Sequence, residues 1–139
     1  MKKLVLLLLV LFSLFSFAKK VNIVILETSD LHGRLFSYDY AIDQVDSSAG
    51  LTKVATIIKE ERAKNKNLIL ADNGDTVQDN NAELFNSMPI HPMIQGLNDL
   101  KYDFWTLGNH EFNFEKEFLL KNISGFKGKV LSANVIKED

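Results

Sequence analysis

Three short polar segments carry residue types that bind metal ions and transfer protons. They are Asp30-Leu31-His32, Gly74-Asp75 and Gly108-Asn109-His110-Glu111. An aspartate oxygen and an imidazole nitrogen together suit a borderline divalent metal. Because Asp30 and His32 are two residues apart, we expect both side chains to leave the same face of an extended strand end and to hold one ion.

The other two segments offer complementary groups. Asp75 follows a glycine, which lets the backbone turn sharply and directs the carboxylate inward. An ionised carboxylate is an acceptor with several lone pairs, so Asp75 can bridge two cations. Asn109 can offer an amide oxygen to the second ion, and the adjacent His110 would stand over the substrate as a hydrogen-bond donor or acid.

Each segment also has an ordinary structural interpretation. An Asp-x-His pair is often a surface pair, Gly-Asp is a common turn, and Gly-Asn-His-Glu can begin a helix that Asn109 caps and Glu111 stabilises through the helix dipole. Their shared position favours the chemical interpretation. Each segment follows its own apolar run, and ligands of open α/β sheets bind at the carboxyl ends of the strands.

The elements that must position these segments can be read from the apolar pattern. Strands are expected at 21–26, 68–71, 104–107 and 129–135, and helices at 51–64, 81–87, 93–100 and 114–121. Ser47 and Ser48 offer capping hydroxyls before the first helix. The segment 36–48 shows no sustained period. The alternation of strands and helices predicts an α/β fold with a parallel or mixed sheet that is covered by helices.

The first 18 residues have the pattern of a signal peptide. Lys2 and Lys3 precede an apolar run over 4–12, and a small-residue cleavage site ends at Ala18. A membrane span needs about 20 apolar residues, and serines interrupt this run, so a permanent anchor is the weaker alternative. We expect cleavage after residue 18, no stable membrane span afterwards, and export to the periplasm, the cell surface or the medium.

Composition bounds the remaining possibilities. Of the 139 residues 46% are hydrophobic and 24% charged, and there is no cysteine, so one globular domain without disulfides is expected. Removing the two leader lysines leaves 14 basic against 18 acidic residues, a net charge of −4. This charge argues against a polymeric nucleic acid as partner. A small phosphorylated substrate stays compatible, because bound cations reverse the local field.

Four stretches of the chain resemble the signatures of one family. They are Thr28-Ser29-Asp30-Leu31-His32, Asp72-Asn73-Gly74-Asp75-Thr76-Val77-Gln78, Ile90-His91-Pro92 and Thr106-Leu107-Gly108-Asn109-His110-Glu111-Phe112-Asn113. They resemble the calcineurin-like metallophosphoesterases, and more closely the 5′-nucleotidase and 2′,3′-cyclic-nucleotide 2′-phosphodiesterase group of secreted bacterial enzymes. The resemblance implies that residues 19–139 are the N-terminal portion of a catalytic domain with a four-layer α/β/β/α sandwich.

The resemblance also implies a role for each site residue. Asp30, His32 and Asp75 match ligands of a first metal, and Asp75 also bridges to a second metal that Asn109 binds. His110 matches the catalytic histidine and, with Asn109, contacts the substrate. Two divalent ions are implied, with Mn²⁺, Zn²⁺ and Fe²⁺ all compatible with these ligands.

One position helps to choose a substrate within the group. The 5′-nucleotidases usually carry an aspartate three residues after the catalytic histidine, whereas this chain has Asn113. That difference resembles the branch that hydrolyses 2′,3′-cyclic nucleotides and 3′-nucleotides. The neutral Asn113 can at most orient His110. A small nucleotide is therefore the expected substrate, and 5′-nucleotidase activity is the alternative.

The same family takes further metal ligands from downstream histidines, including a Gly-His-x-His stretch. The three histidines here are His32, His91 and His110, and His91 beside Pro92 is expected to be a structural contact at a helix start. We therefore expect weak metal binding and little activity from these residues alone, whether they are a fragment or the product of a shortened gene. An exported non-catalytic remnant or binding module is the alternative from another class. The oligomeric state is left open.

Overall fold

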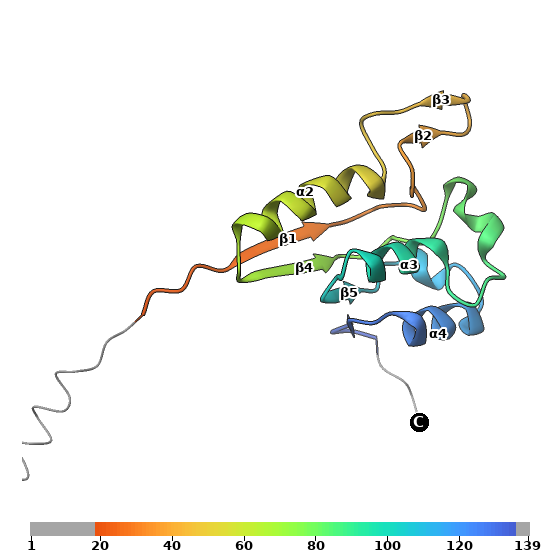
Figure 1. Cartoon of the computed structure of the whole chain (residues 1–139). Coiled ribbons are helices and arrows are strands. Elements are labelled where there is room, and N and C mark those ends of the chain that lie inside the picture. Colours follow the sequence, from red (N-terminus) through yellow and green to blue (C-terminus); the bar gives the residue numbers. More distant parts are fainter. Residues whose placement is uncertain (1–18, 136–139) are drawn as a thin grey trace, which may run out of the picture.

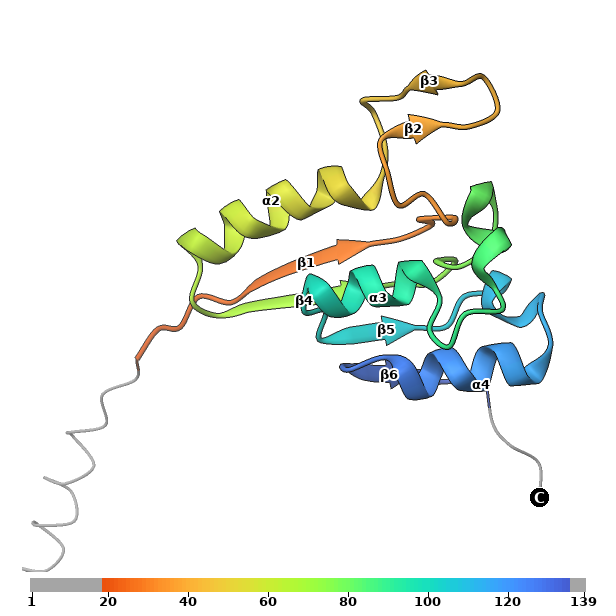
Figure 2. The same ribbon diagram turned by 45° about the vertical axis from the view of Figure 1, so that its right-hand side comes forward.

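A four-stranded parallel sheet carries the three polar segments at its carboxyl edge. The computed structural model describes residues 19–135, so the predicted signal peptide lies outside the described residues. The strands are β1 (Val24–Thr28), β4 (Leu68–Asp72), β5 (Phe104–Thr106) and β6 (Lys129–Leu131). They lie in the order β1-β4-β5-β6, and every neighbouring pair is parallel; β1 and β4 run side by side in Figure 1, and Figure 2 labels all four strands.

A helix makes each connection between neighbouring strands. The helices are α2 (Leu51–Lys64), α3 (Pro92–Asp99) and α4 (Lys116–Gly125), with 3-10 turns η1 (Asn80–Phe85) and η2 (His110–Phe112) beside them. In the turned view α3 and α4 lie in front of the sheet, and α2 runs along β1 (Figure 2). Parallel strands need such crossovers, because a tight hairpin can join only antiparallel neighbours.

The helices cover one face of the sheet. In the strand register Leu26, Leu70, Trp105 and Val130 point to the same side, and all four belong to the hydrophobic core together with residues of the three helices. On the opposite face Ile25 is 66% exposed. The predicted α/β class is confirmed, and the described residues form a helix layer and a sheet layer of the expected sandwich.

Several expected element bounds are wrong by a few residues. The first strand extends to Thr28 because its last residue pairs with Asp72, and the last strand ends at Leu131. The helix expected at 81–87 is the 3-10 turn η1. The segment 36–48, which shows no period, contains a two-stranded antiparallel hairpin of β2 (Tyr38–Asp39) and β3 (Gln44–Val45).

The start of α2 also differs from the prediction. Its N-cap is Gly50 without a side-chain capping hydrogen bond, so the expected serine caps are wrong. Ser48 donates its hydroxyl hydrogen bond to Asp46 instead, at 2.5 Å. Gly50 has φ 109°, and a Cβ there would lie 2.7 Å from the Phe36 carbonyl oxygen. The close approach of the chain just before the hairpin therefore requires glycine at this N-cap position.

His91 is a buried structural residue, as the sequence predicts. It is the N-cap of α3, where its Nδ1 accepts a hydrogen bond from the Met93 N–H at 3.3 Å. Its Nε2 donates to the Ala82 carbonyl of η1 at 3.1 Å. Burial lowers the pKa of His91 to about 4, so the ring is neutral near pH 7.

No helix within residues 19–135 has both the length and the apolar character needed to cross a membrane.

Candidate metal centre

The loops that follow β1 and β4 continue to pair beyond the ends of the strands. Asp30 N–H donates to the Gly74 carbonyl at 3.0 Å, and His32 N–H donates to the Asp75 carbonyl at 2.9 Å. The Gly33 N–H donates to the Thr76 carbonyl at 2.9 Å. Residues separated by more than forty positions are thereby held side by side.

Two glycines allow the loop after β5 to join them. Gly74 has φ 99°, and a Cβ on it would clash with the backbone of Gly108. A Cβ on Gly108 would clash in turn with the side chain of Asp75. The sharp turn predicted at Gly74 is confirmed. It allows close contact between the second and third polar segments.

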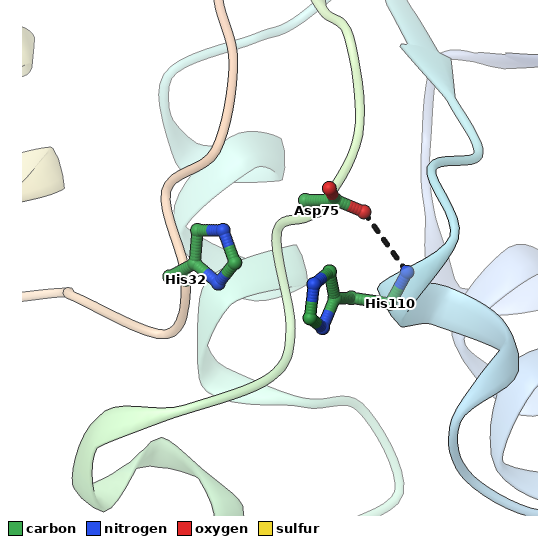
Figure 3. A group of neighbouring side chains, drawn as sticks. All are labelled: His32, Asp75 and His110. Carbon is green, nitrogen blue, oxygen red and sulfur yellow. Dashed lines mark hydrogen bonds between the residues drawn. The ribbon is translucent and has the colours of Figure 1, made fainter.

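Three side chains from the three loops form a compact cluster. His32, Asp75 and His110 each offer a ligand atom, and these atoms all lie within 4.8 Å of one another. Figure 3 shows one residue from each polar segment facing a common centre. All three residues are half-buried, so the cluster is open to solvent on one side.

Of the two other predicted ligands, Asp30 contacts a residue of this cluster, and Asn109 directly precedes His110 in the chain. Asp30 Oδ1 is 3.7 Å from His32 Nε2, a separation at which one ion with bonds of about 2.0–2.2 Å can bind both atoms. Asn109 is exposed at the N-cap of η2, and its side chain makes no capping hydrogen bond there. The alternative in which Asn109 caps a helix is therefore wrong.

The reason expected for the Asp30–His32 pairing is wrong, although the pairing itself forms. β1 ends at Thr28, and both residues adopt left-handed backbone conformations, with φ 55° for Asp30 and φ 45° for His32. Asp75 also has φ 55°. Side chains with a Cβ are uncommon in this region, and such strain gathers at functional sites. A turn, and not strand alternation, brings the carboxylate and the imidazole together.

His110 is anchored at both its backbone and its ring. Its N–H donates to Asp75 Oδ1 at 2.9 Å, and its Nδ1 lies 2.5 Å from Gln78 Oε1. Asn113 Nδ2 donates to the same Gln78 oxygen at 2.5 Å, so Asn113 helps to fix the amide that contacts the ring of His110. The ring of His110 also meets the ring of His32 edge to face, with centroids 4.8 Å apart. His110 is thus within reach of a metal as well as of a substrate.

Glu111 has a role beyond the predicted interaction with a helix dipole. It is fully buried, and its carboxyl oxygens accept three backbone N–H groups: Asp75 at 2.9 Å, Thr76 at 2.7 Å and Gly108 at 2.7 Å. One side chain therefore fastens the second polar segment to the third. The only hint in the sequence is its place beside His110, since no spacing rule specifies these partners.

Asp72 also stabilises the loops that carry the polar segments. It is fully buried at the end of β4 and accepts hydrogen bonds from the Thr28 hydroxyl at 2.5 Å, the Thr76 hydroxyl at 2.5 Å and the Gly74 N–H at 3.1 Å. Burial nevertheless outweighs these bonds and raises the pKa of Asp72 to about 6.

This raised pKa predicts a pH-dependent stability. Between the ordinary value of 3.8 and about 6, the folded state binds more protons at Asp72 than the unfolded state does. The contribution of Asp72 is therefore complete below 3.8 and is lost as the pH rises through about 6. Replacing Asp72 with asparagine, which resembles the protonated acid, should stabilise the fold at pH 7 by on the order of 2 kcal/mol and have little effect near pH 4.

Urea denaturation of both proteins at these two pH values measures the difference. Asp99→Asn, which removes the same charge from an exposed position on α3, should give the same small change at both. If Asp72→Asn destabilises the protein equally at the two pH values, the ionised carboxylate is the form that the fold requires.

Arg34 does not join the cluster. It forms an ion pair with Asp46 at 2.7 Å and approaches Asp39 at 3.6 Å. Because Asp39 and Asp46 belong to the β2–β3 hairpin and its continuation, these contacts hold the hairpin against the loop that follows β1. Arg34 is therefore a half-buried structural residue.

The donor set of the cluster fits a divalent transition metal. Imidazole nitrogen and carboxylate oxygen together suit Mn²⁺, Fe²⁺ and Zn²⁺, and the two aspartates supply negative charge for a doubly charged ion. His32 Nδ1 lies 2.7 Å from Asp79 Oδ2, a carboxylate contact that is usual behind a metal-binding histidine. One side chain from each of the three loops could thus contribute to holding a metal ion.

Comparison with known proteins gives a consistent result. The profile of the calcineurin-like phosphoesterases matches residues 23–137. The chain is 38% identical over 130 residues to the trifunctional nucleotide phosphoesterase protein YfkN of Bacillus subtilis, covering 86% of this chain and 9% of that protein. It is 35% identical over 125 residues to a 2′,3′-cyclic-nucleotide 2′-phosphodiesterase/3′-nucleotidase of Yersinia enterocolitica, covering 86% of this chain and 19% of that enzyme.

A third relative and a solved structure extend the comparison. The chain is 35% identical over 121 residues to the snake venom 5′-nucleotidase of Naja atra, covering 82% of this chain and 22% of that enzyme. The crystal structure of YfkN superimposes with a TM-score of 0.71 and 37% identity, over 78% of this chain and 36% of that one. The chain thus spans less than a quarter of the length of these curated relatives.

Proposed function

The chain belongs to the calcineurin-like phosphoesterase family, and from this premise we propose that it serves metal-dependent hydrolysis of nucleotide phosphoesters. The observation that carries the proposal is the cluster of His32, Asp75 and His110, whose ligand atoms lie within 4.8 Å of one another. The substrate that we propose is a 2′,3′-cyclic nucleotide, opened to a 3′-nucleotide and then hydrolysed to nucleoside and phosphate.

The proposed metal ligands are His32, Asp75, Asp30 and Asn109. Two divalent ions held there would act as Lewis acids that polarise the phosphoryl oxygens and neutralise developing charge. Asp75 would be shared by the two ions, as the family resemblance implies, and its Oδ1 also accepts from the His110 N–H at 2.9 Å, which holds the carboxylate in place. The identity of the metal, Mn²⁺, Zn²⁺ or Fe²⁺, is a matter for measurement.

His110 is the proposed acid. In the first step the oxygen of a water forms a bond to phosphorus and releases one proton to solvent, and the bond from phosphorus to the 2′ oxygen breaks. The protonated His110 ring gives its Nε2 proton to that leaving oxygen, while Nδ1–H stays bound to Gln78. The neutral Asn113, whose Nδ2 donates to Gln78 Oε1 at 2.5 Å, helps to orient His110 through Gln78 without adding charge, which supports the cyclic-nucleotide branch over the 5′-nucleotidases.

Export, the kind of partner and the activity of these residues alone are further proposals. Residues 1–18 are proposed to direct export to the periplasm, the cell surface or the medium, since Lys2 and Lys3 precede an apolar run. A net charge of −4 after removal of that leader supports a small nucleotide, and not a polymer, as the partner. The 139 residues alone are proposed to bind metal weakly and turn over slowly, because the downstream histidines that the resemblance implies are not among them.

Removing metal tests the proposal directly. A protein expressed from the complete reading frame is expected to hydrolyse bis-p-nitrophenyl phosphate with added Mn²⁺ and to lose this activity in EDTA, because the ligand cluster supplies no alternative Lewis acid. The rate should return when Mn²⁺ is restored in excess. Hydrolysis that persists in EDTA would contradict a metal-dependent mechanism, and no hydrolysis under any condition would favour the non-catalytic binding module.

The preferred substrate distinguishes the proposed cyclic-nucleotide phosphodiesterase from the alternative 5′-nucleotidase. The same protein is expected to release product from 2′,3′-cyclic AMP and 3′-AMP faster than from 5′-AMP. A preference for 5′-AMP would support the alternative 5′-nucleotidase, to which the Naja atra relative belongs by name.

A further inference from the structure

Two adjacent residues on the loop after β4 contact the two histidines of the cluster. Gln78 Oε1 lies 2.5 Å from His110 Nδ1, and Asp79 Oδ2 lies 2.7 Å from His32 Nδ1. Neither Gln78 nor Asp79 is among the residues that the sequence pattern selects for the site. In both imidazoles, Nδ1 therefore faces an oxygen atom.

These contacts define where the ring protons lie. An ionised carboxylate and an amide oxygen can only accept, so the nitrogen that faces each of them must donate. Gln78 Oε1 also accepts from Asn113 Nδ2 at 2.5 Å, which is consistent with the amide oxygen being the atom turned toward His110. Both imidazoles thus carry their proton on Nδ1, and both Nε2 atoms keep a free lone pair.

We propose that Gln78 and Asp79 are positioning residues that hold His110 and His32 in the Nδ1–H tautomer. The tautomers follow from the contacts alone, whereas their use in metal binding and proton transfer rests on the proposed function. With Nδ1 engaged, Nε2 of His32 faces Asp30 Oδ1 at 3.7 Å, where both atoms can reach one ion. Nε2 of His110 is left to meet the substrate or a metal.

The backbone of Asp79 supports this assignment. Asp79 has φ 72° and ψ 175°, a region that is open almost only to glycine, so a side chain here costs stability. The loop is nevertheless held in place, because Asp79 N–H donates to Glu83 Oε1 at 2.9 Å and the next residue, Asn80, donates to the His32 carbonyl at 2.6 Å. What the aspartate adds at this strained position is its hydrogen bond to the ring of His32.

His91 supplies an internal reference of the opposite kind. Its Nδ1 accepts from the Met93 N–H and its Nε2 donates to the Ala82 carbonyl, so it carries its proton on Nε2. The described residues therefore contain two Nδ1–H histidines and one Nε2–H histidine. A measurement that reports tautomers can read all three rings in one sample.

Long-range ¹H–¹⁵N correlation spectra of the ¹⁵N-histidine-labelled chain, recorded without metal near pH 8 where imidazoles are neutral, test the proposal. The wild type should show the Nδ1–H pattern for His32 and His110 and the Nε2–H pattern for His91. Gln78→Ala should shift only His110 toward Nε2–H, the form that prevails in water, and Asp79→Gly should shift only His32. Gln78→Glu keeps an acceptor oxygen and should retain the wild-type pattern.

A stability measurement excludes a merely structural role. Because glycine relieves the strained conformation of Asp79, the Asp79→Gly protein should unfold at the same or a higher temperature than the wild type while binding Mn²⁺ about 10–100-fold more weakly. The proposal is overturned if His32 and His110 carry the Nε2–H pattern in the wild type, or if the variants leave both patterns unchanged. If instead the tautomers respond as stated and no phosphoester is hydrolysed, the proposed function fails and the positioning role stands.

Discussion

Replacing His110 with alanine is expected to lower kcat for 2′,3′-cyclic AMP by about 10²–10⁴-fold, the range that a positioned acid contributes. The physical reason is that the leaving 2′ oxygen then departs without a proton donor, since the nearest nitrogen of Asn113 is an amide. The reaction is followed with the protein expressed from the complete reading frame in saturating Mn²⁺. Phe112→Ala, an exposed neighbour in η2, should keep the wild-type rate.

The His110→Ala variant also distinguishes two roles for His110, that of an acid and that of a metal ligand. As an acid, its loss should leave the Mn²⁺ affinity within about 3-fold of the wild type, whereas losing a ligand should reduce that affinity more than about 10-fold. Isothermal titration with Mn²⁺ measures this independently of turnover. An unchanged kcat would remove His110 from the chemistry altogether.

Replacing Glu111 with alanine is expected to destabilise the fold by about 3–6 kcal/mol. Three backbone N–H groups, those of Asp75, Thr76 and Gly108, would lose their acceptor in a region where Glu111 itself is fully buried. Each buried donor without a partner costs about 1–3 kcal/mol, and a whole domain has only about 5–15 kcal/mol of stability. Urea denaturation followed by circular dichroism measures the loss.

Two further variants sharpen this test. Glu111→Gln keeps one acceptor oxygen but turns an amide N–H₂ toward backbone donors, so its effect should lie between the wild type and alanine. Glu115→Ala removes an exposed carboxyl group that forms no capping bond, and it should change stability by no more than about 0.5 kcal/mol. If Glu111→Ala also falls within that limit, the three hydrogen bonds do not fasten the loops together.

The pair Asp30 and His32 comes together by a geometry other than the expected one. Residue type and spacing predict that both side chains bind one metal, but the expected extended geometry is absent, and a turn brings the carboxylate to 3.7 Å from the imidazole. Both residues are left-handed because the loop after β1 pairs with the loop after β4 beyond the end of the sheet. A period of two describes a strand, and the chain leaves the strand before it reaches Asp30.

Glu111 and Asp79 form contacts that the sequence alone does not predict. Glu111 belongs to the third polar segment and Asp79 directly follows the stretch that ends at Gln78, but no periodicity distinguishes either residue from the solvated acids elsewhere in the chain. Three of the bonds that these carboxyl groups form, to Asp75, Thr76 and His32, reach partners 35 to 47 positions away along the sequence. Contacts over such separations depend on how the loops pack, so they become visible only in the folded chain.

By itself the sequence determined the class of fold and the place of the site. Alternating apolar runs and helical patterns specify a parallel sheet, and polar residues that follow each run must meet at its carboxyl edge because all the strands point the same way. Tertiary structure alone decided which atoms face one another. Packing between separate loops produces the ring tautomers, the three bonds to Glu111 and the close contact of Gly74 with Gly108. These contacts are short-range in space, and the spacing of residues along the chain does not encode them.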